Sequence, residues 1–79
     1  MHLEIVTPEK SIYSGTIKLI QVPGSKGQFE VLRNHAAIIS TLIAGKIKVV
    51  DHEDKKSFFD IKGGVVDVNN NKIVVLAEI

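Results

Sequence analysis

Cysteine and tryptophan are absent from this 79-residue sequence, and proline occurs only twice. Small secreted domains commonly depend on disulfides, so the lack of cysteine favours a reducing compartment. No apolar run approaches the roughly 20 residues that a transmembrane helix needs, which predicts a chain that does not span a membrane. The first ten residues, MHLEIVTPEK, lack the basic patch, apolar stretch and cleavage site of a signal peptide.

An excess of charge of one sign is also missing. Ten basic and nine acidic side chains leave a formal net charge of +1. A chain so nearly neutral lacks the electrostatic field that attracts nucleic acids or an acidic membrane surface. The few aromatic residues are not interleaved with Lys and Arg as base-stacking surfaces require. A β-barrel that binds nucleic acid is therefore disfavoured, and a salt-dependent affinity for single strands would revive it.

The sequence is rich in alternating apolar and polar residues, which is the pattern of a half-buried strand. In GKIKVVD, Ile47 and Val49 alternate with Lys46 and Lys48. Further strand-like runs are HLEIV (2–6), TIKLIQV (16–22), FEVL (29–32), SFFDIK (57–62), VVDV (65–68) and KIVVLA (72–77). Turn residues separate these runs at short intervals, so the spacing predicts a single all-β domain, a sandwich or barrel, over residues 1–79.

Turn and core positions follow from the same pattern. Pro23-Gly24 and Gly27 bracket a tight loop, DHEDKK forms a polar hairpin end, and NNN supplies residues that tolerate positive φ. Gly63-Gly64 predicts a bulge or a close approach between strands. The apolar residues expected in the core are Ile20, Phe29, Val31, Ile47, Val49, Phe59, Ile61 and Val74.

One segment, NHAAIISTLIAGK (34–46), is compatible with two structures. An asparagine stands where a helix N-cap would lie, and a glycine stands where the helix would stop. As a strand, the segment would place Ile38 and Leu42 on one face and Ile39 and Ile43 on the other, buried on both sides. Periodicity alone does not decide between helix and strand.

No catalytic constellation is evident. The three histidines, at positions 2, 35 and 52, do not fall at metal-ligand spacings such as HxH or HExxH. No serine lies in a GxSxG nucleophile elbow, and there is no cysteine nucleophile. The glycines of GSKG lack the longer Gly-rich run of a phosphate-binding P-loop. We therefore predict a protein that is not an enzyme and has neither a metal site nor a cofactor.

Three separated motifs resemble one known family in their order and spacing. They are LEIVTPEKSIYSG at the start, VPGSKGQFEVLRNHAAIISTLIAGKIKV in the middle and GGVVDVNNNKIVVLAE near the end. Together they look like the N-terminal β-sandwich domain of the epsilon subunit of F-type ATP synthase, over essentially the whole chain. The family's usual pattern is PGxxGxFGxLPxHAPxxSxLxxG, from which this chain departs at Glu30, Arg33 and Ala37.

The resemblance implies a flattened sandwich of about ten short strands. It also favours a strand for residues 36–43, because the family has a proline at the position of Ala37 and proline restricts the residue before it. In the family this domain lies at the foot of the rotating central stalk and contacts the gamma subunit and the membrane c ring. The complex is then expected on the cytoplasmic side of the bacterial inner membrane, and the isolated domain is expected to be soluble and monomeric.

Carried over position by position, the resemblance assigns two groups of contact residues. The group expected to face the c ring is Ser25, Lys26, Gly27, Gln28 and Glu30, and the group expected to face gamma is Arg33, His35 and Ser40. An exposed apolar stripe at alternate strand positions would mark the partner face, but the sequence does not show which face carries it.

Family members normally continue after VLAE into a two-helix hairpin associated with regulation. We expect this chain to be naturally short and, by itself, neither to bind ATP nor to inhibit hydrolysis through such a hairpin.

A carrier domain of the lipoyl or biotinyl type is the alternative function, because such domains are also all-β and present a modified lysine at a hairpin tip. Here that lysine would be Lys55, in HEDKKSF. The strand pattern on either side of Lys55 does not mirror itself as it does in carrier domains. An intact mass would discriminate, since a carrier gains a covalent group on one lysine.

Overall fold

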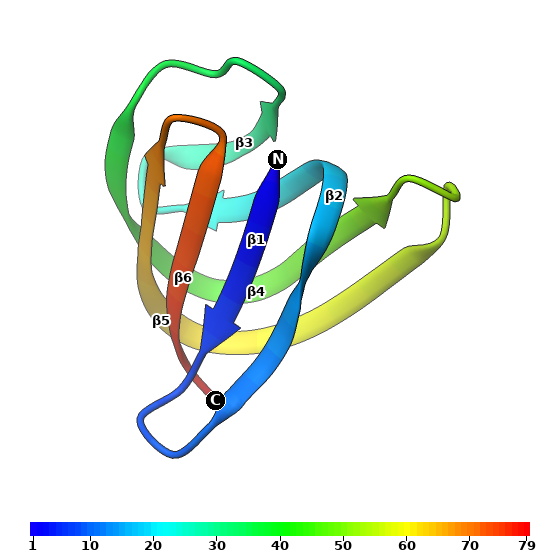
Figure 1. Ribbon diagram of the computed structural model, residues 1–79. Helices are drawn as coiled ribbons and strands as arrows, with labels where there is room; N and C mark the ends of the chain where they lie inside the picture. The colour runs from blue at the N-terminus through cyan, green and yellow to red at the C-terminus, as the bar shows by residue number, and fades with distance from the viewer.

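The computed structural model describes residues 1–79 and consists of six strands, which confirms the all-β prediction (Figure 1). The strands are β1 (His2–Val6), β2 (Ser11–Gly24), β3 (Gly27–Leu32), β4 (Ile38–Asp51), β5 (Lys56–Asn69) and β6 (Lys72–Glu78). None of its elements is a helix that could cross a membrane.

The expected number of about ten short strands is wrong because several predicted runs are continuous. β2, β4 and β5 each extend over 14 residues. The runs 57–62 and 65–68 both lie within β5, and the segments 36–43 and 45–51 join within β4 from Ile38 onward. Each long strand bends, so one strand serves both layers of the sandwich.

The strands close into a flattened barrel. Their order is β1-β6-β5-β4-β2-β3, and β1 also pairs with β2. Five strands therefore form a closed ring, while β3 pairs only with β2 and lies at the edge. The first half of β2 pairs with β1 and its second half with β3 and β4. All pairs are antiparallel except β1 with β6.

The side of the β4–β5 hairpin that faces the core changes along its length. Near the turn, Ile47 and Val49 of β4 are buried, whereas toward the start of the strand the buried residue is Leu42. Strand side chains alternate between faces, so a change from odd to even positions means that the inner face has changed. The register with β5 is continuous across this point, so the change comes from bending and twisting and not from a bulge.

Gly64 of β5 lies where the hairpin bends against β6. Its φ is 154°, and a Cβ atom at this position would overlap the carbonyl oxygen of Leu76. Only glycine leaves the two backbones room at this point. The prediction that Gly63-Gly64 marks a close approach between strands is thus confirmed at Gly64.

Fifteen buried apolar side chains form one core, and no polar or charged side chain is buried. The buried members of the predicted core are Ile20, Val31, Ile47, Val49 and Ile61. Phe29 and Phe59 are half-buried and pack against this core. The prediction is wrong for Val74, which is only half-buried because its neighbours Ile73 and Val75 point inward from β6.

The ambiguous segment is a strand from Ile38 onward, which confirms the choice of strand over helix. The expectation that it is buried on both sides is wrong, because Ile39 is 73% exposed and Ile43 is 53% exposed. This half of β4 has the core on one side only. Nothing in the chain covers its outer side.

Candidate partner-binding site

The residues expected to face the c ring lie on the β2–β3 hairpin. Ser25 and Lys26 form the exposed turn, which confirms the tight loop predicted after Pro23-Gly24. The others follow along β3 and are exposed as well: Gly27, Gln28 and Glu30. The Ser25 N–H donates to the Thr41 carbonyl oxygen at 3.0 Å, and the two side-chain oxygens lie 2.8 Å apart. The turn is therefore anchored to β4.

Gly24 makes this hairpin compact. A Cβ atom at Gly24 would lie 2.7 Å from the Gly27 carbonyl oxygen and 2.8 Å from the ring of Phe29. The ring therefore lies against the glycine backbone, which a larger residue would prevent. The hairpin is held both by this packing and by the contact of Ser25 with Thr41.

The loop from Arg33 to Ala37 joins β3 to β4 and passes beside the β5–β6 turn at the top of Figure 1. The Asn34 N–H donates to Asn71 Oδ1 at 2.7 Å, and Asn71 Nδ2 donates to Asn34 Oδ1 at 3.2 Å. Both asparagines have positive φ, at 65° and 60°. Asparagine tolerates this conformation better than most residues, and at Asn71 the prediction made from the NNN motif is confirmed.

The residues expected to face gamma do not form one cluster. Arg33 lines one cleft, and His35 lines a separate hollow with residues 69–71; Asn71 lines both. The His35 N–H donates to the Leu32 carbonyl oxygen at 3.1 Å. Ser40 lies further on in β4, half-buried.

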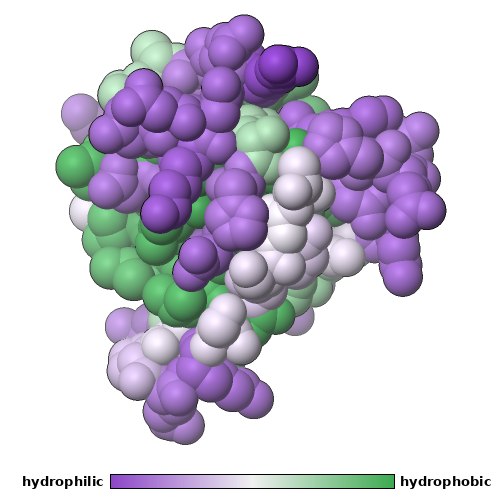
Figure 2. Space-filling view, viewed as in Figure 1, coloured by the Kyte–Doolittle hydropathy of each residue, from purple (hydrophilic) through white to green (hydrophobic).

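An apolar patch covers the outer face of β1, β6, β5 and β4. Cross-strand pairs form a row from Val6 to Leu76, from Leu76 to Val65 and from Val65 to Thr41. We define the outer apolar face by the residues Val6, Ile39, Ile43, Val65, Val74 and Leu76, which share this side through the strand register. Figure 2 shows a hydrophobic area at the lower left, where β5 and β6 run in Figure 1.

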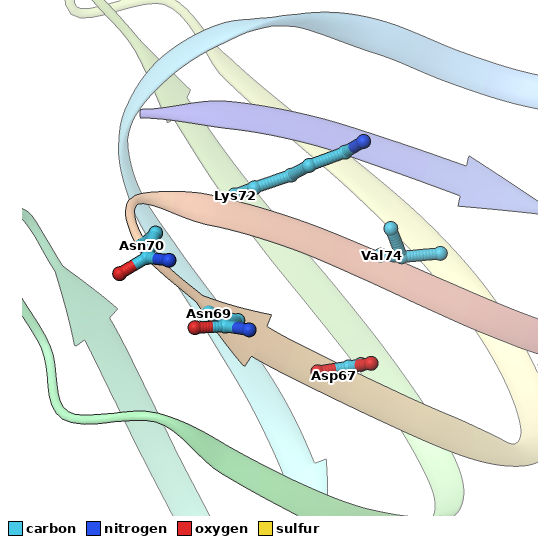
Figure 3. A pocket seen from close by; sticks show the side chains of 5 residues that line it. All are labelled: Asp67, Asn69, Asn70, Lys72 and Val74. Atoms are coloured by element: carbon cyan, nitrogen blue, oxygen red, sulfur yellow. The ribbon is translucent and has the colours of Figure 1, made fainter.

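The same outer face becomes polar toward the β5–β6 turn. A shallow hollow there is lined by Asp67 and Asn69 of β5, Asn70 of the turn, and Lys72 and Val74 of β6 (Figure 3). An apolar centre with a polar rim is the usual composition of a protein–protein interface. The arrangement offers a docking surface.

No group of three His, Cys, Asp or Glu residues is placed to hold a metal ion. Lys55 lies in the exposed β4–β5 turn, where its backbone N–H donates to Asp51 Oδ1 at 2.9 Å. This contact gives the turn an ordinary structural explanation.

Two continuous apolar runs in the sequence indicate the outer apolar face, although the reading based on alternation did not use them. VV at 65–66 and IVVL at 73–76 are continuous apolar runs, which are typical of strands covered on both sides. The chain covers only one side of these strands, because Val66, Ile73 and Val75 are buried whereas Leu76 is 56% exposed.

The sequence matches one protein family along its whole length. The family is described as "ATP synthase, Delta/Epsilon chain, beta-sandwich domain", and the match covers residues 1–79. The match supports the resemblance to the epsilon subunit and gives no support to a carrier domain modified at Lys55.

Several relatives are ATP synthase epsilon chains. That of Caulobacter vibrioides is 42% identical, over 99% of this chain and 90% of the relative. That of Campylobacter concisus is 41% identical, over 99% of this chain but only 60% of the relative. The relatives therefore differ in how far they extend beyond the matched region.

Two solved structures share the fold. A chain of the Euglena gracilis mitochondrial ATP synthase assembly of OSCP, F1 and c ring superposes with a TM-score of 0.90 at 22% identity, over 95% of this chain and 48% of that one. A chain of the central stalk and c ring of the Tetrahymena thermophila mitochondrial ATP synthase superposes with a TM-score of 0.84 at 18% identity. The superposition covers 100% of this chain and 63% of that one. At these identities the likeness establishes the fold.

Proposed function

Because this chain belongs to the delta/epsilon family of ATP synthase subunits through its β-sandwich domain, we propose that it links the gamma subunit to the membrane c ring in the central stalk. The epsilon chain is not itself catalytic and belongs to a membrane-associated complex. The proposed role is mechanical, in that the domain couples ion flow through the ring to ATP synthesis by transmitting rotation.

The observation that carries this proposal is the outer apolar face. Leu76, Ile39 and Ile43 are 56%, 73% and 53% exposed, and they lie on one side of the barrel in register with Val65 and Val6. Contiguous exposed apolar residues with a polar rim are typical of a surface that another protein covers. We assign this face to the gamma subunit.

The residues expected to face gamma lie at different distances from this face. The His35 loop leads directly into Ile38 and Ile39, and Ser40 lies between Ile39 and Thr41 on β4. We propose that His35 contacts gamma at the edge of the outer apolar face. Ser40 remains a predicted gamma contact, but its side chain lies on the opposite side of β4 from Ile39 and Ile43, because strand side chains alternate between faces. Arg33 remains a predicted gamma contact, although it lines a different depression from His35.

We assign the β2–β3 hairpin to the c ring. Lys26 and Glu30 give its exposed surface charges of both signs, and the Ser25–Thr41 contacts anchor its turn. A polar, anchored projection suits a contact with polar loops at a membrane surface. In a bacterial cell, this contact would place the domain on the cytoplasmic side of the inner membrane, held there through its partners.

Co-expression with the gamma subunit of the same organism tests the first assignment. Gel filtration should yield a one-to-one complex with the wild type, and the double variant Ile39→Glu, Leu76→Glu should abolish it. Phe58→Glu is the matched control, because Phe58 is 57% exposed but lies near the other end of β5. The double variant Arg33→Glu, His35→Ala should weaken the complex without abolishing it.

Two results would contradict the proposal. One is a gamma complex that survives Ile39→Glu, Leu76→Glu unchanged, and the other is the absence of any complex with the wild-type chain. For the ring, a cysteine introduced by Gln28→Cys should crosslink to the c subunit in membranes, whereas one introduced by Phe58→Cys should not. Equal crosslinking by both variants would argue against the hairpin as the ring contact.

A further inference from the structure

A second surface feature lies apart from the outer apolar face. It is a cleft at the end of the barrel where the start of β1, the end of β3 and the middle of β2 come together. The cleft is lined by Met1, Ile17, Lys18, Leu32, Arg33, His52 and Asn71. We call this the Arg33 cleft. Its polar lining includes one arginine, one lysine and one histidine but no carboxylate.

Arg33 is a side-chain cation of this cleft that has no partner within the chain. It is the only arginine in the chain, and its guanidinium makes neither an ion pair nor a hydrogen bond. The residue that follows it, Asn34, is fixed to Asn71 by two hydrogen bonds, which holds the backbone beside Arg33 in place. An arginine on a fixed backbone has less conformational freedom to lose when it binds a ligand.

Lys18 already binds an anion of the chain itself. Its Nζ lies 2.5 Å from Oδ1 of Asp54, a residue of the β4–β5 turn with a φ of 61°. The ion pair is exposed on both sides, with side-chain exposures of 46% for Lys18 and 76% for Asp54. Exposed ion pairs are weak, so an external anion can compete with Asp54 for Lys18.

We propose that the Arg33 cleft binds a phosphoryl group between Arg33 and Lys18, in competition with the carboxylate of Asp54. The guanidinium presents planar, paired N–H donors that suit the oxygens of a tetrahedral phosphate, and an ammonium supplies a second positive charge. His52 and Asn71 also line the cleft, and both carry groups able to donate to a phosphate oxygen. This site goes beyond the proposed function and does not depend on it.

The phosphoryl group could arrive as inorganic phosphate or on a phospholipid headgroup. The test uses the whole chain, labelled with ¹⁵N, and follows the signals of Arg33, Lys18 and His52 by NMR as inorganic phosphate is added at constant ionic strength. A parallel titration uses vesicles of phosphatidylglycerol, with phosphatidylcholine vesicles for comparison. Saturable shifts in the first titration alone assign free phosphate, and tighter binding to phosphatidylglycerol assigns the headgroup.

Three single variants make the test specific. Arg33→Gln should weaken phosphate binding roughly tenfold or more, because a charge-assisted contact is lost. Asp54→Asn should tighten binding about threefold, because it removes the competing carboxylate. Lys26→Gln is the matched control, since it removes the same charge at an exposed turn away from the cleft and should leave binding unchanged.

Three results would contradict the proposed phosphoryl site. Absence of saturable shifts in both titrations excludes it, and equal losses with Arg33→Gln and Lys26→Gln would reduce it to a nonspecific charge effect. Unchanged or weaker binding by Asp54→Asn would show that Asp54 does not compete. The circular dichroism spectrum of each variant should match the wild type, since all three changed residues are exposed.

Discussion

Asn34 and Asn71 are 37 residues apart in sequence, yet each side chain hydrogen-bonds to the other residue. The pair joins the β3–β4 loop to the β5–β6 turn, and Asn71 lines both the hollow of His35 and the cleft of Arg33. It therefore positions two of the residues expected to contact gamma. Asn71 of this pair also lines the proposed phosphoryl site.

Asn71→Ala should loosen the β3–β4 loop. The change removes an acceptor and a donor and places alanine at a φ of 60°, so we expect unfolding free energy to fall by about 1–3 kcal/mol. Urea denaturation measures this loss, and faster exchange of the Asn34 amide hydrogen locates it. Asn70→Ala is the control, because Asn70 also has positive φ, at 50°, but no side-chain hydrogen bond. Equal effects of the two changes would assign the whole loss to backbone strain.

Gly64→Ala should be far more destabilising than Gly63→Ala. A Cβ atom at Gly64 overlaps the Leu76 carbonyl oxygen in the neighbouring strand, whereas at Gly63 the nearest atom lies at an ordinary 3.4 Å. We expect a loss of about 3 kcal/mol or more at Gly64 and less than about 1 kcal/mol at Gly63, measured by thermal and urea unfolding. Similar stabilities of the two variants would mean that the bend absorbs the added methyl group.

Lys18 lowers the pKa of the Asp54 carboxyl below its ordinary value of 3.8, first through the hydrogen bond and then through its charge. NMR titration of the wild type and of Lys18→Gln should show this pKa rise in the variant. A lowered pKa means that the ion pair favours the folded state above the ordinary pKa. This contribution is lost as the pH falls through the lower, folded value. An unchanged pKa in Lys18→Gln would contradict the ion pair.

The test of the outer apolar face and the test of the Arg33 cleft are independent of each other. The first needs the gamma subunit, and the second needs only this chain and phosphate. The double variant Ile39→Glu, Leu76→Glu should lose the gamma complex but bind phosphate as the wild type does, because neither residue lines the cleft. The two surfaces can therefore be assigned separately.

The sequence by itself determined the fold class, the turns and most of the core. Alternation at Ile47 and Val49 sets the strand period, and GG and NNN mark backbone conformations that few other residues adopt. The order of the three motifs also identified the family. The alternation and the turn signals are local, so a window of a few residues contains the physical information needed to recognise them, whereas the order of the motifs is read along the whole chain.

The tertiary structure decided what depends on distant strands. The side of β4 that carries Ile39 is exposed only because the barrel buries the opposite side and nothing covers this one. Six strands replace about ten short ones because β2, β4 and β5 each run continuously over 14 residues and bend across both layers. The Asn34–Asn71 pair and the Arg33 cleft likewise join segments whose closeness follows from closure of the barrel, which no local pattern records.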